Sequence, residues 1–216
     1  MCELIFIAIF SYILGSIPFS YIIAKAYGKN LYEIGSRNIG AANVYRATGK
    51  VEALLMAVVG DVGKGALSIF LAQRISTFSP EYGIILPQAV AAFFVVLGHN
   101  WPIFLIFKGG RGLAALAGVI IFLNWKVIFF VLITIGVFIF LTELVTGGRE
   151  KFQGGIKGLF KIFISQVAGR MIGIGASVIL VLVLYPEIFK IVFPAVILSA
   201  IKHIKRTKTF LEGEAP

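Results

Sequence analysis

The chain has 216 residues, of which 59% are apolar and only 14% are charged, and its formal net charge is +10. A soluble domain carries about a quarter charged residues, so this composition excludes an ordinary water-soluble fold. The lysines and arginines lie in clusters between apolar runs, which favours anionic lipid headgroups and phosphorylated substrates as partners and argues against nucleic acid. We expect one membrane domain, residues 1–216, that acts as a monomer.

Apolar segments recur along the whole chain, and they predict an all-α integral membrane protein, a bundle of about seven short transmembrane helices. A crossing helix needs about 20 apolar residues, and several of these segments are shorter. The segments are Leu4–Ile23, Ala53–Leu71, Ile84–Gly98, Leu113–Leu123, Val127–Leu144, Ile172–Leu184 and Ile188–Ile201. For Leu113–Leu123, a re-entrant segment is the alternative to a full crossing.

The distribution of basic residues predicts the orientation of this bundle. Lysines and arginines gather in residues 25–50, 108–111, 149–170 and 202–208, whereas the opposite loops hold only Arg74, Lys126 and Lys190. Basic loops stay on the cytoplasmic side of a membrane. We therefore expect the N-terminus outside, the C-terminus in the cytoplasm, and any active-site loops on the cytoplasmic face.

The polar stretch after the first apolar segment contains a run of small and hydrogen-bonding residues, GSRNIGAANVYR at positions 35–46. Small residues such as Gly40 let a backbone approach a ligand closely. Ser36, Asn38 and Asn43 offer neutral hydrogen bonds, and Arg46 offers a fork suited to phosphate. The structural alternative is a solvated loop rich in turn residues.

A second polar loop follows the third apolar segment and contains Lys108, Gly109, Gly110 and Arg111. Successive N–H groups in a glycine-rich run can form a nest for an anion, and the helix expected to start near Leu113 adds its positive end. A membrane-border loop with snorkelling cations is the alternative. Two such loops on one face of one bundle favour a phosphate site.

The titratable residues outside these two loops do not suggest a metal site or a nucleophilic catalytic group. Asp61 and Lys64, three residues apart inside the second apolar segment, are interpreted as a buried ion pair that braces the site rather than as a substrate contact. His99 and His203 both fall on the predicted cytoplasmic side, and Cys2 is the single cysteine. We expect no metal, no cofactor and no covalent intermediate on the protein.

Three stretches of the sequence resemble the motifs of one enzyme family, the acyl-phosphate:glycerol-3-phosphate acyltransferases, or PlsY family. The first is residues 35–46 preceded by GSIPF at 15–19, the second is Asp61-x-x-Lys64-Gly65, and the third runs from Gly98-His99 to the FKGGRG of residues 107–112. The resemblance covers the chain apart from an insertion at 143–169. It implies a seven-helix bacterial inner-membrane enzyme that moves a fatty acyl group from acyl phosphate to the sn-1 hydroxyl of glycerol 3-phosphate, giving lysophosphatidate.

The resemblance also assigns roles to residues. It places Ser36, Asn38, Gly40 and Asn43 near the reacting groups. It makes phosphate ligands of Arg46, Lys108, Arg111 and His203, with Gly109 and Gly110 in the same loop. The general base is either His203 or a phosphate oxygen of the substrate, and the substrate oxygen is preferred.

Several positions depart from the family pattern. Trp101, Arg111 and Ala115 replace a usual Phe, Lys and Thr, and in the tail Arg206, Thr207, Thr209 and Ala215 replace the family's residues while His203 keeps its spacing. Ser177 is the nearest candidate for serines that the family carries between its fifth and sixth spans. A divergent, non-catalytic lipid-binding paralogue is therefore one alternative, and a small-anion transporter is the other.

The insertion at 143–169 is predicted to lie on the cytoplasmic surface of the membrane. Apolar residues recur at helical spacing between positions 147 and 169, and Lys157, Lys161 and Ser165 form a polar stripe. This pattern is typical of an interfacial helix. A disordered loop is the alternative, because Gly154, Gly155 and Gly158 weaken a helix there.

Overall fold

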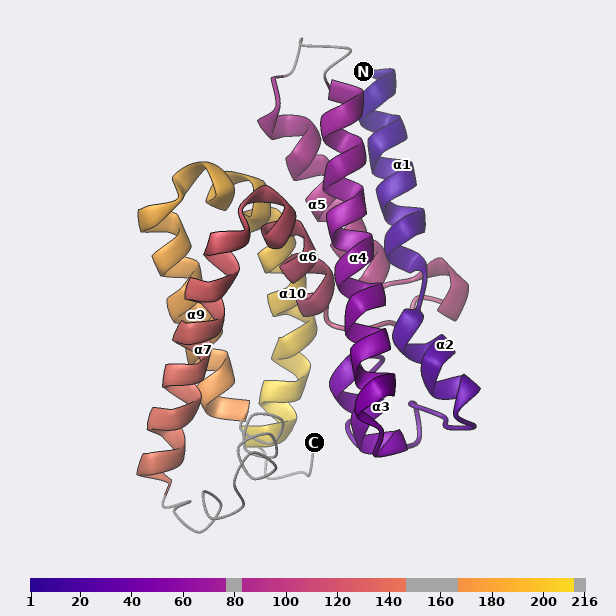
Figure 1. Ribbon diagram of the computed structural model, residues 1–216, viewed down its shortest axis with the longest axis vertical. Coiled ribbons are helices and arrows are strands. Elements are labelled where there is room, and N and C mark those ends of the chain that lie inside the picture. The colour runs from indigo at the N-terminus through magenta and orange to yellow at the C-terminus, as the bar shows by residue number, and fades with distance from the viewer. Residues whose placement is uncertain (77–82, 147–166, 212–216) are drawn as a thin grey trace. The chain divides into compact units, whose positions relative to one another are not determined.

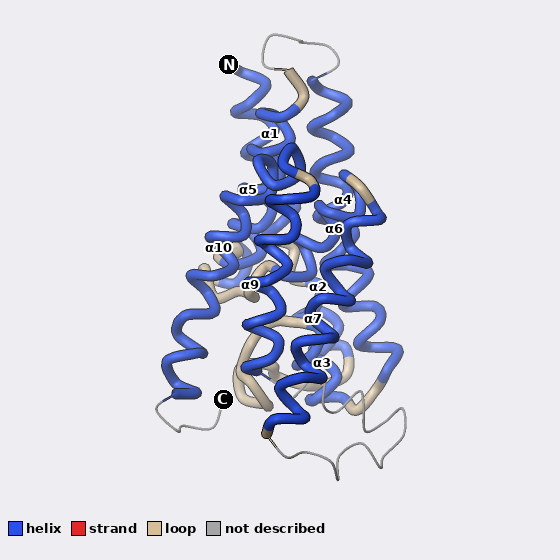
Figure 2. The backbone as a smooth tube through the Cα atoms, turned by 90° about the vertical axis from the view of Figure 1, so that its left-hand side faces the viewer, coloured by secondary structure: helices blue, strands red, loops and turns tan. Residues whose placement is uncertain are grey.

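The computed structural model describes residues 1–76, 83–146 and 167–211, and every regular element in those ranges is helical (Figures 1 and 2). The prediction of an all-α fold is confirmed for these residues. The chain divides into two compact units, one made of Met1–Leu123 with Lys190–Pro216 and the other of Asn124–Phe189. Each unit is described here by itself, and the single domain expected from the sequence stays a prediction.

Four segments of the described chain are long and apolar enough to cross a membrane, namely Cys2–Ala26, Val51–Ser76, Ile85–Leu105 and Trp125–Val145. Two shorter apolar helices, Leu113–Leu123 and Met171–Leu184, accompany them. A helix of 11 residues such as Leu113–Leu123 is about 16 Å long, roughly half the thickness of the hydrocarbon core. The count of seven crossings stays a prediction.

The first apolar segment is broken into two helices, α1 (Cys2–Ser16) and α2 (Phe19–Ala26), whereas the sequence pattern predicted one span over Leu4–Ile23. Pro18 causes the break, because the residue before a proline is driven out of the helical region. Ile17 is accordingly extended, with φ −64° and ψ 115°. The break frees backbone carbonyls at the end of α1 for other partners.

The polar stretch that follows is not entirely a loop, because α3 (Ala41–Thr48) forms inside it. The prediction of a loop over residues 35–46 is therefore wrong for its second half. Ala41 and Ala42 favour a helix, and Gly49 ends it in the left-handed conformation with φ 67°, as a C-terminal glycine commonly does. Arg46 lies in the last turn, where a cation is favoured by the helix dipole.

Pairs of glycines bring the long helices of the first unit together. A Cβ on Gly15 of α1 would collide with the backbone of Val95, and one on Gly98 would collide with the carbonyl of Tyr12. Gly98 lies in α5 (Ile85–Asn100), so α1 and α5 touch through backbone in both directions. α4 (Val51–Ser76) and α6 (Leu113–Leu123) repeat this arrangement through Gly65 and Gly118.

The last helix, α10, spans Pro186–Leu211 and so extends well beyond the predicted span Ile188–Ile201. Its part in the first unit contacts the end of α5. The Asn100 Nδ2 donates to the carbonyl of Leu198 at 3.1 Å, and the Lys202 ammonium lies 4.6 Å from the centre of the Trp101 ring. These contacts fix α10 beside the start of the glycine loop.

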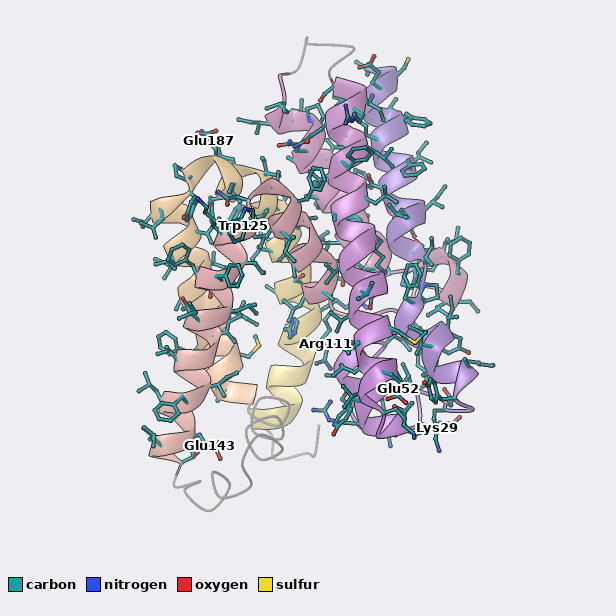
Figure 3. The ribbon with its side chains drawn as sticks, viewed as in Figure 1. Lys29, Glu52, Arg111, Trp125, Glu143 and Glu187 are labelled. Carbon is teal, nitrogen blue, oxygen red and sulfur yellow. The ribbon has the colours of Figure 1, made fainter. Side chains whose placement is uncertain are left out.

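The second unit is built on α7 (Trp125–Val145) and α9 (Val167–Leu184). Gly169 and Gly173 lie against the backbone of α7, and Ser177, one turn further, donates to the Gly173 carbonyl at 2.7 Å. Figure 3 shows Trp125 and Glu187 at one end of this unit and Glu143 at the other. The predicted interfacial helix lies almost wholly in residues 147–166, outside the described residues.

Candidate active site

The two polar loops singled out in the sequence meet in the first unit. The Tyr32 hydroxyl, just before the first loop, donates to the Lys108 carbonyl of the glycine loop at 2.8 Å. A Cβ on Gly110 would meet the carbonyl of Ile39, so the two loops also touch through backbone. Burial, and the neighbouring Tyr21, raise the pKa of the Tyr32 phenol, so the phenol keeps its proton for this bond.

Asn43 holds the first loop in shape. Its side-chain oxygen accepts from the Ser36 N–H at 3.0 Å, and its amide nitrogen donates to the carbonyls of Leu31, Ile34 and Asn38 at 3.2, 3.0 and 3.1 Å. The side chain is 1% exposed. All of its polar atoms are thus used on the backbone, which makes Asn43 a brace of the loop.

The remaining polar residues of this loop are more accessible. Ser36, Asn38, Gly40 and Arg46 are all partly exposed. Ser36 lies in a tight turn between two residues with positive φ, Gly35 at 58° and Arg37 at 50°. Burial lowers the pKa of the Arg46 guanidinium, but an arginine stays charged at neutral pH.

The glycine loop begins with a strained backbone. Ile106 and Phe107 both have positive φ, 50° and 61°, which is unusual for bulky or branched residues and is maintained only where the surroundings require it. Lys108 follows and is exposed, Gly109 is half-buried, Gly110 is buried and Arg111 is half-buried. Figure 3 shows Arg111 between α10 and α4.

Helix α6 starts directly after this loop, at Leu113. Its first N–H groups have no carbonyl partners within the helix, so its N-terminus offers donors and a positive dipole end to an anion. Gly112 makes the connection with φ 79°, and a side chain there would meet Ser199 of α10. The loop, α6 and α10 are thereby fixed to one another.

His203 lies one turn after Ser199 on α10 and is 8% exposed. Its Nδ1 donates to the Ser199 carbonyl at 2.8 Å. In the neutral imidazole this bond makes Nε2 the basic nitrogen. The structure therefore brings His203 into the same unit as both loops, through the contact between Ser199 and Gly112.

Asp61 and Lys64 form an ion pair inside α4, with 2.9 Å between the ammonium and the carboxylate. Their side chains are 2% and 1% exposed. The Ser20 hydroxyl donates to the other carboxylate oxygen at 2.9 Å, and His99 Nδ1 lies 3.6 Å from the first. Desolvation of an isolated charge is costly, so each ion depends on these partners.

Some contributors to the site could not be identified from the sequence. Tyr32, which joins the two loops, looked like one more aromatic residue in a polar stretch. Ser20 lies in an apolar segment and pairs with a residue 41 positions away. The predicted Ser177 lies on α9 in the second unit, where its hydroxyl bonds to α7 and α9 carbonyls.

The arrangement suits a phosphorylated ligand. The two joined loops carry three exposed or half-buried cations, Arg46, Lys108 and Arg111, beside a glycine-rich backbone and a helix N-terminus. These are the elements that bind phosphate. Within residues 1–76, 83–146 and 167–211, no group of three or more His, Cys, Asp or Glu side chains could hold a metal ion.

Comparison with known proteins gives a consistent answer. Residues 5–213 match the model of the family described as glycerol-3-phosphate acyltransferase. A glycerol-3-phosphate acyltransferase of Wolbachia pipientis subsp. Culex pipiens is 36% identical over 207 residues, which is 96% of this chain and 94% of that protein. The enzyme of the same name from Thermotoga petrophila is 32% identical over 206 residues, 95% of this chain and 91% of that protein.

Two solved structures have a similar fold. Both are crystal structures of PlsY (YgiH), an integral membrane glycerol 3-phosphate acyltransferase, one in a glycerol 3-phosphate form and one in a lysophosphatidic acid form. Each is 25% identical and covers 99% of this chain and 94% of its own, with TM-scores of 0.70 and 0.69. This likeness confirms the expectation of an integral membrane protein. The chain belongs to the glycerol-3-phosphate acyltransferase family, as the resemblance of its motifs indicated.

Proposed function

We propose that this protein transfers a fatty acyl group from acyl phosphate to the sn-1 hydroxyl of glycerol 3-phosphate. The ester bond forms between the acyl carbon and the sn-1 oxygen, the acyl–phosphate bond breaks, and the products are lysophosphatidate and inorganic phosphate. The hydrogen bond between Tyr32 and Lys108 carries this proposal, because it joins two loops that each suit a phosphate. Both substrates of the proposed reaction, acyl phosphate and glycerol 3-phosphate, carry a phosphate group.

The residues divide into two tasks. Arg46, Lys108, Arg111 and the backbone of Gly109 neutralise phosphate charge, and His203 lies nearby on α10. Gly110 shapes the same turn, since its N–H donates to the His99 carbonyl. Ser36, Asn38 and the backbone at Gly40 orient the glycerol hydroxyl and the carbonyl that is attacked. Asn43 supports them from beneath through its four backbone hydrogen bonds. Catalysis of this kind depends on positioning and on electrostatic stabilisation.

The proton of the sn-1 hydroxyl must leave as the new ester bond forms. A phosphate oxygen of the acyl phosphate accepts it in this proposal, since that phosphate leaves as a product and gains basicity as its bond to the acyl carbon breaks. His203 is the other candidate, through its Nε2. Because acyl phosphate is already activated, no protein nucleophile is needed.

The decisive experiment gives the purified protein acyl phosphate and labelled glycerol 3-phosphate and measures labelled lysophosphatidate. Parallel reactions with acyl thioesters in place of acyl phosphate test the donor. Label that appears only with a thioester contradicts acyl phosphate as the donor. Glycerol 3-phosphate binding without turnover on any donor would instead support the non-catalytic lipid-binding paralogue.

A further inference from the structure

The buried polar cluster around Asp61 reaches the glycine loop through one side chain, His99. Asp61 is the centre of the cluster, with Lys64 and Ser20 at 2.9 Å and His99 Nδ1 at 3.6 Å. These groups are nearly sealed from solvent, and His99, at 7%, is the most exposed of them. A charge network this deep in an apolar bundle is costly unless every member is held.

Lys64 is fully used in holding this cluster to the end of α1. Beyond Asp61, its ammonium donates to the carbonyls of Gly15 and Ile17 at 2.8 and 2.9 Å. An ammonium has three N–H donors, so none is left for a ligand. Asp61 and Lys64 therefore fix the α1–α2 break against α4, and a direct role for them in binding substrate is not supported.

His99 contacts both this cluster and the glycine loop. Its carbonyl accepts the Gly110 N–H at 3.0 Å. A Cβ built on Gly110 would collide with His99 Nε2, and one on Gly109 would collide with the His99 carbonyl. The ring edge opposite Asp61 thus lies directly against the Gly109–Gly110 turn of the glycine loop.

A small cavity lies beside this contact, between the cluster and the loop. It measures about 10 Å³ and is lined by Asp61, Lys64, His99, Ser20 and Gly109, among others. That volume is at the lower limit for one water molecule and far too small for a phosphate. A phosphate therefore does not bind to His99 within this cavity.

We propose that His99 is a positioning residue, packed between Asp61 and Gly110, that keeps the Gly109–Gly110 turn in its phosphate-binding shape. The proposal rests on the function proposed above, because it names the support of that same phosphate site. Loss of the support should weaken phosphate binding in the ground state and the transition state alike. The expected signature is a higher KM with a kcat that changes little.

The test compares three variants of the full-length purified enzyme. His99→Ala removes the ring, and His99→Asn keeps a polar side chain beside Asp61 but withdraws the ring from Gly110. Ser68→Ala is the matched control, since Ser68 is another buried polar side chain and bonds to Ser11 Oγ at 2.8 Å, but lies on α4 one turn beyond Lys64 and two turns beyond Asp61. We expect KM for glycerol 3-phosphate or acyl phosphate to rise roughly tenfold in both His99 variants, with kcat within about threefold.

A purely structural role for His99 gives a different result. His99→Asn and Ser68→Ala would then lower the thermal midpoint to a similar degree and leave both KM values unchanged, and this outcome overturns the proposal. Binding of inorganic phosphate, measured by calorimetry, is independent of turnover. If the wild-type protein has no transferase activity, the proposed function fails, but a roughly tenfold weaker phosphate affinity in His99→Asn still supports His99 as the positioning residue. An unchanged phosphate affinity refutes it.

Discussion

Asn43 and Ser36 are joined by a hydrogen bond but have different tasks. The Asn43 side chain is buried and spends its oxygen and its amide on four backbone groups. Ser36 gives its backbone N–H to this network, and the residue is partly exposed. Stability and chemistry are therefore separated between neighbouring residues of one short motif.

Asn43→Ala should destabilise the protein, whereas Asn38→Ala should mainly reduce its activity. The first change leaves three carbonyls and one N–H without their partner, and net losses of about 1 kcal/mol per bond predict a cost of about 2–4 kcal/mol. Thermal unfolding in detergent measures this cost. Asn38 is partly exposed and contributes only its backbone carbonyl to the brace. Equal thermal midpoints for the two variants would contradict this division.

Arg46→Lys should weaken glycerol 3-phosphate binding far more than it weakens the fold. Lysine keeps the charge and the favourable position at the end of α3, but loses the fork that can grip a phosphate with two parallel bonds. A lost charged contact of this kind costs about 1.5–3 kcal/mol. The measurement is KM for glycerol 3-phosphate beside the thermal midpoint. An unchanged KM removes Arg46 from the phosphate site.

At the scale of the helices, close approach of the backbones at glycines positions the site. Gly15 and Gly98 join α1 to α5, and Gly65 and Gly118 join α4 to α6. Each pair lies next to a functional residue, since Gly98 precedes His99 and Gly65 follows Lys64. Helices in a membrane associate mainly through close packing. Burial of apolar surface contributes little free energy there, because the lipid is itself apolar.

Gly65→Ala should disturb both packing and activity, and Gly63→Ala should disturb neither. A methyl group on Gly65 would enter the backbone of Ala115, whereas nothing lies within 4 Å of one on Gly63. Overpacking costs about 1–3 kcal/mol, while alanine in place of an exposed helical glycine gains about 0.5–1 kcal/mol. Thermal midpoints and turnover of the two variants, two residues apart on one helix, give the comparison. Equal behaviour would show that α4 and α6 are not in tight contact.

The long helices were largely predictable, because the length and composition of an apolar segment directly indicate a membrane helix. Leu113–Leu123 begins and ends as the sequence predicted. The break at Pro18 and the helix α3 were missed, because the apolar run continues through the proline and because Gly, Asn and Ser occur both in loops and at helix starts. Contacts across long separations, such as Ser20 with Asp61, have no local signal at all.

At the scale of the molecule, the first unit has two chemically different ends. Met1 lies at one end of it, and the last turns of α10 lie toward the other, where α2 and α3 are also found (Figures 1 and 2). Figure 3 places Lys29 and Glu52 at that second end. Apolar side chains such as Val59, 69% exposed, cover the helices between, as expected of a surface that faces lipid. Both polar loops of the site thus belong to the half of the unit away from Met1.

This polarity gives a prediction for the topology: the N-terminus is outside the cell and the C-terminal end of α10 is in the cytoplasm. Cys2 is the single cysteine and is exposed, so an impermeant thiol reagent added outside intact cells should label the natural protein. Cys2→Ser combined with Leu211→Cys should be labelled only after the membrane is permeabilised.

The insertion, which lies outside the described residues, is tested in the same way with Cys2→Ser combined with Lys157→Cys. If the insertion lies on the cytoplasmic surface, this protein should also be labelled only after the membrane is permeabilised. An extra crossing within the insertion would instead place residue 211 outside. Labelling of residue 211 in intact cells would therefore contradict the topology and the cytoplasmic site together.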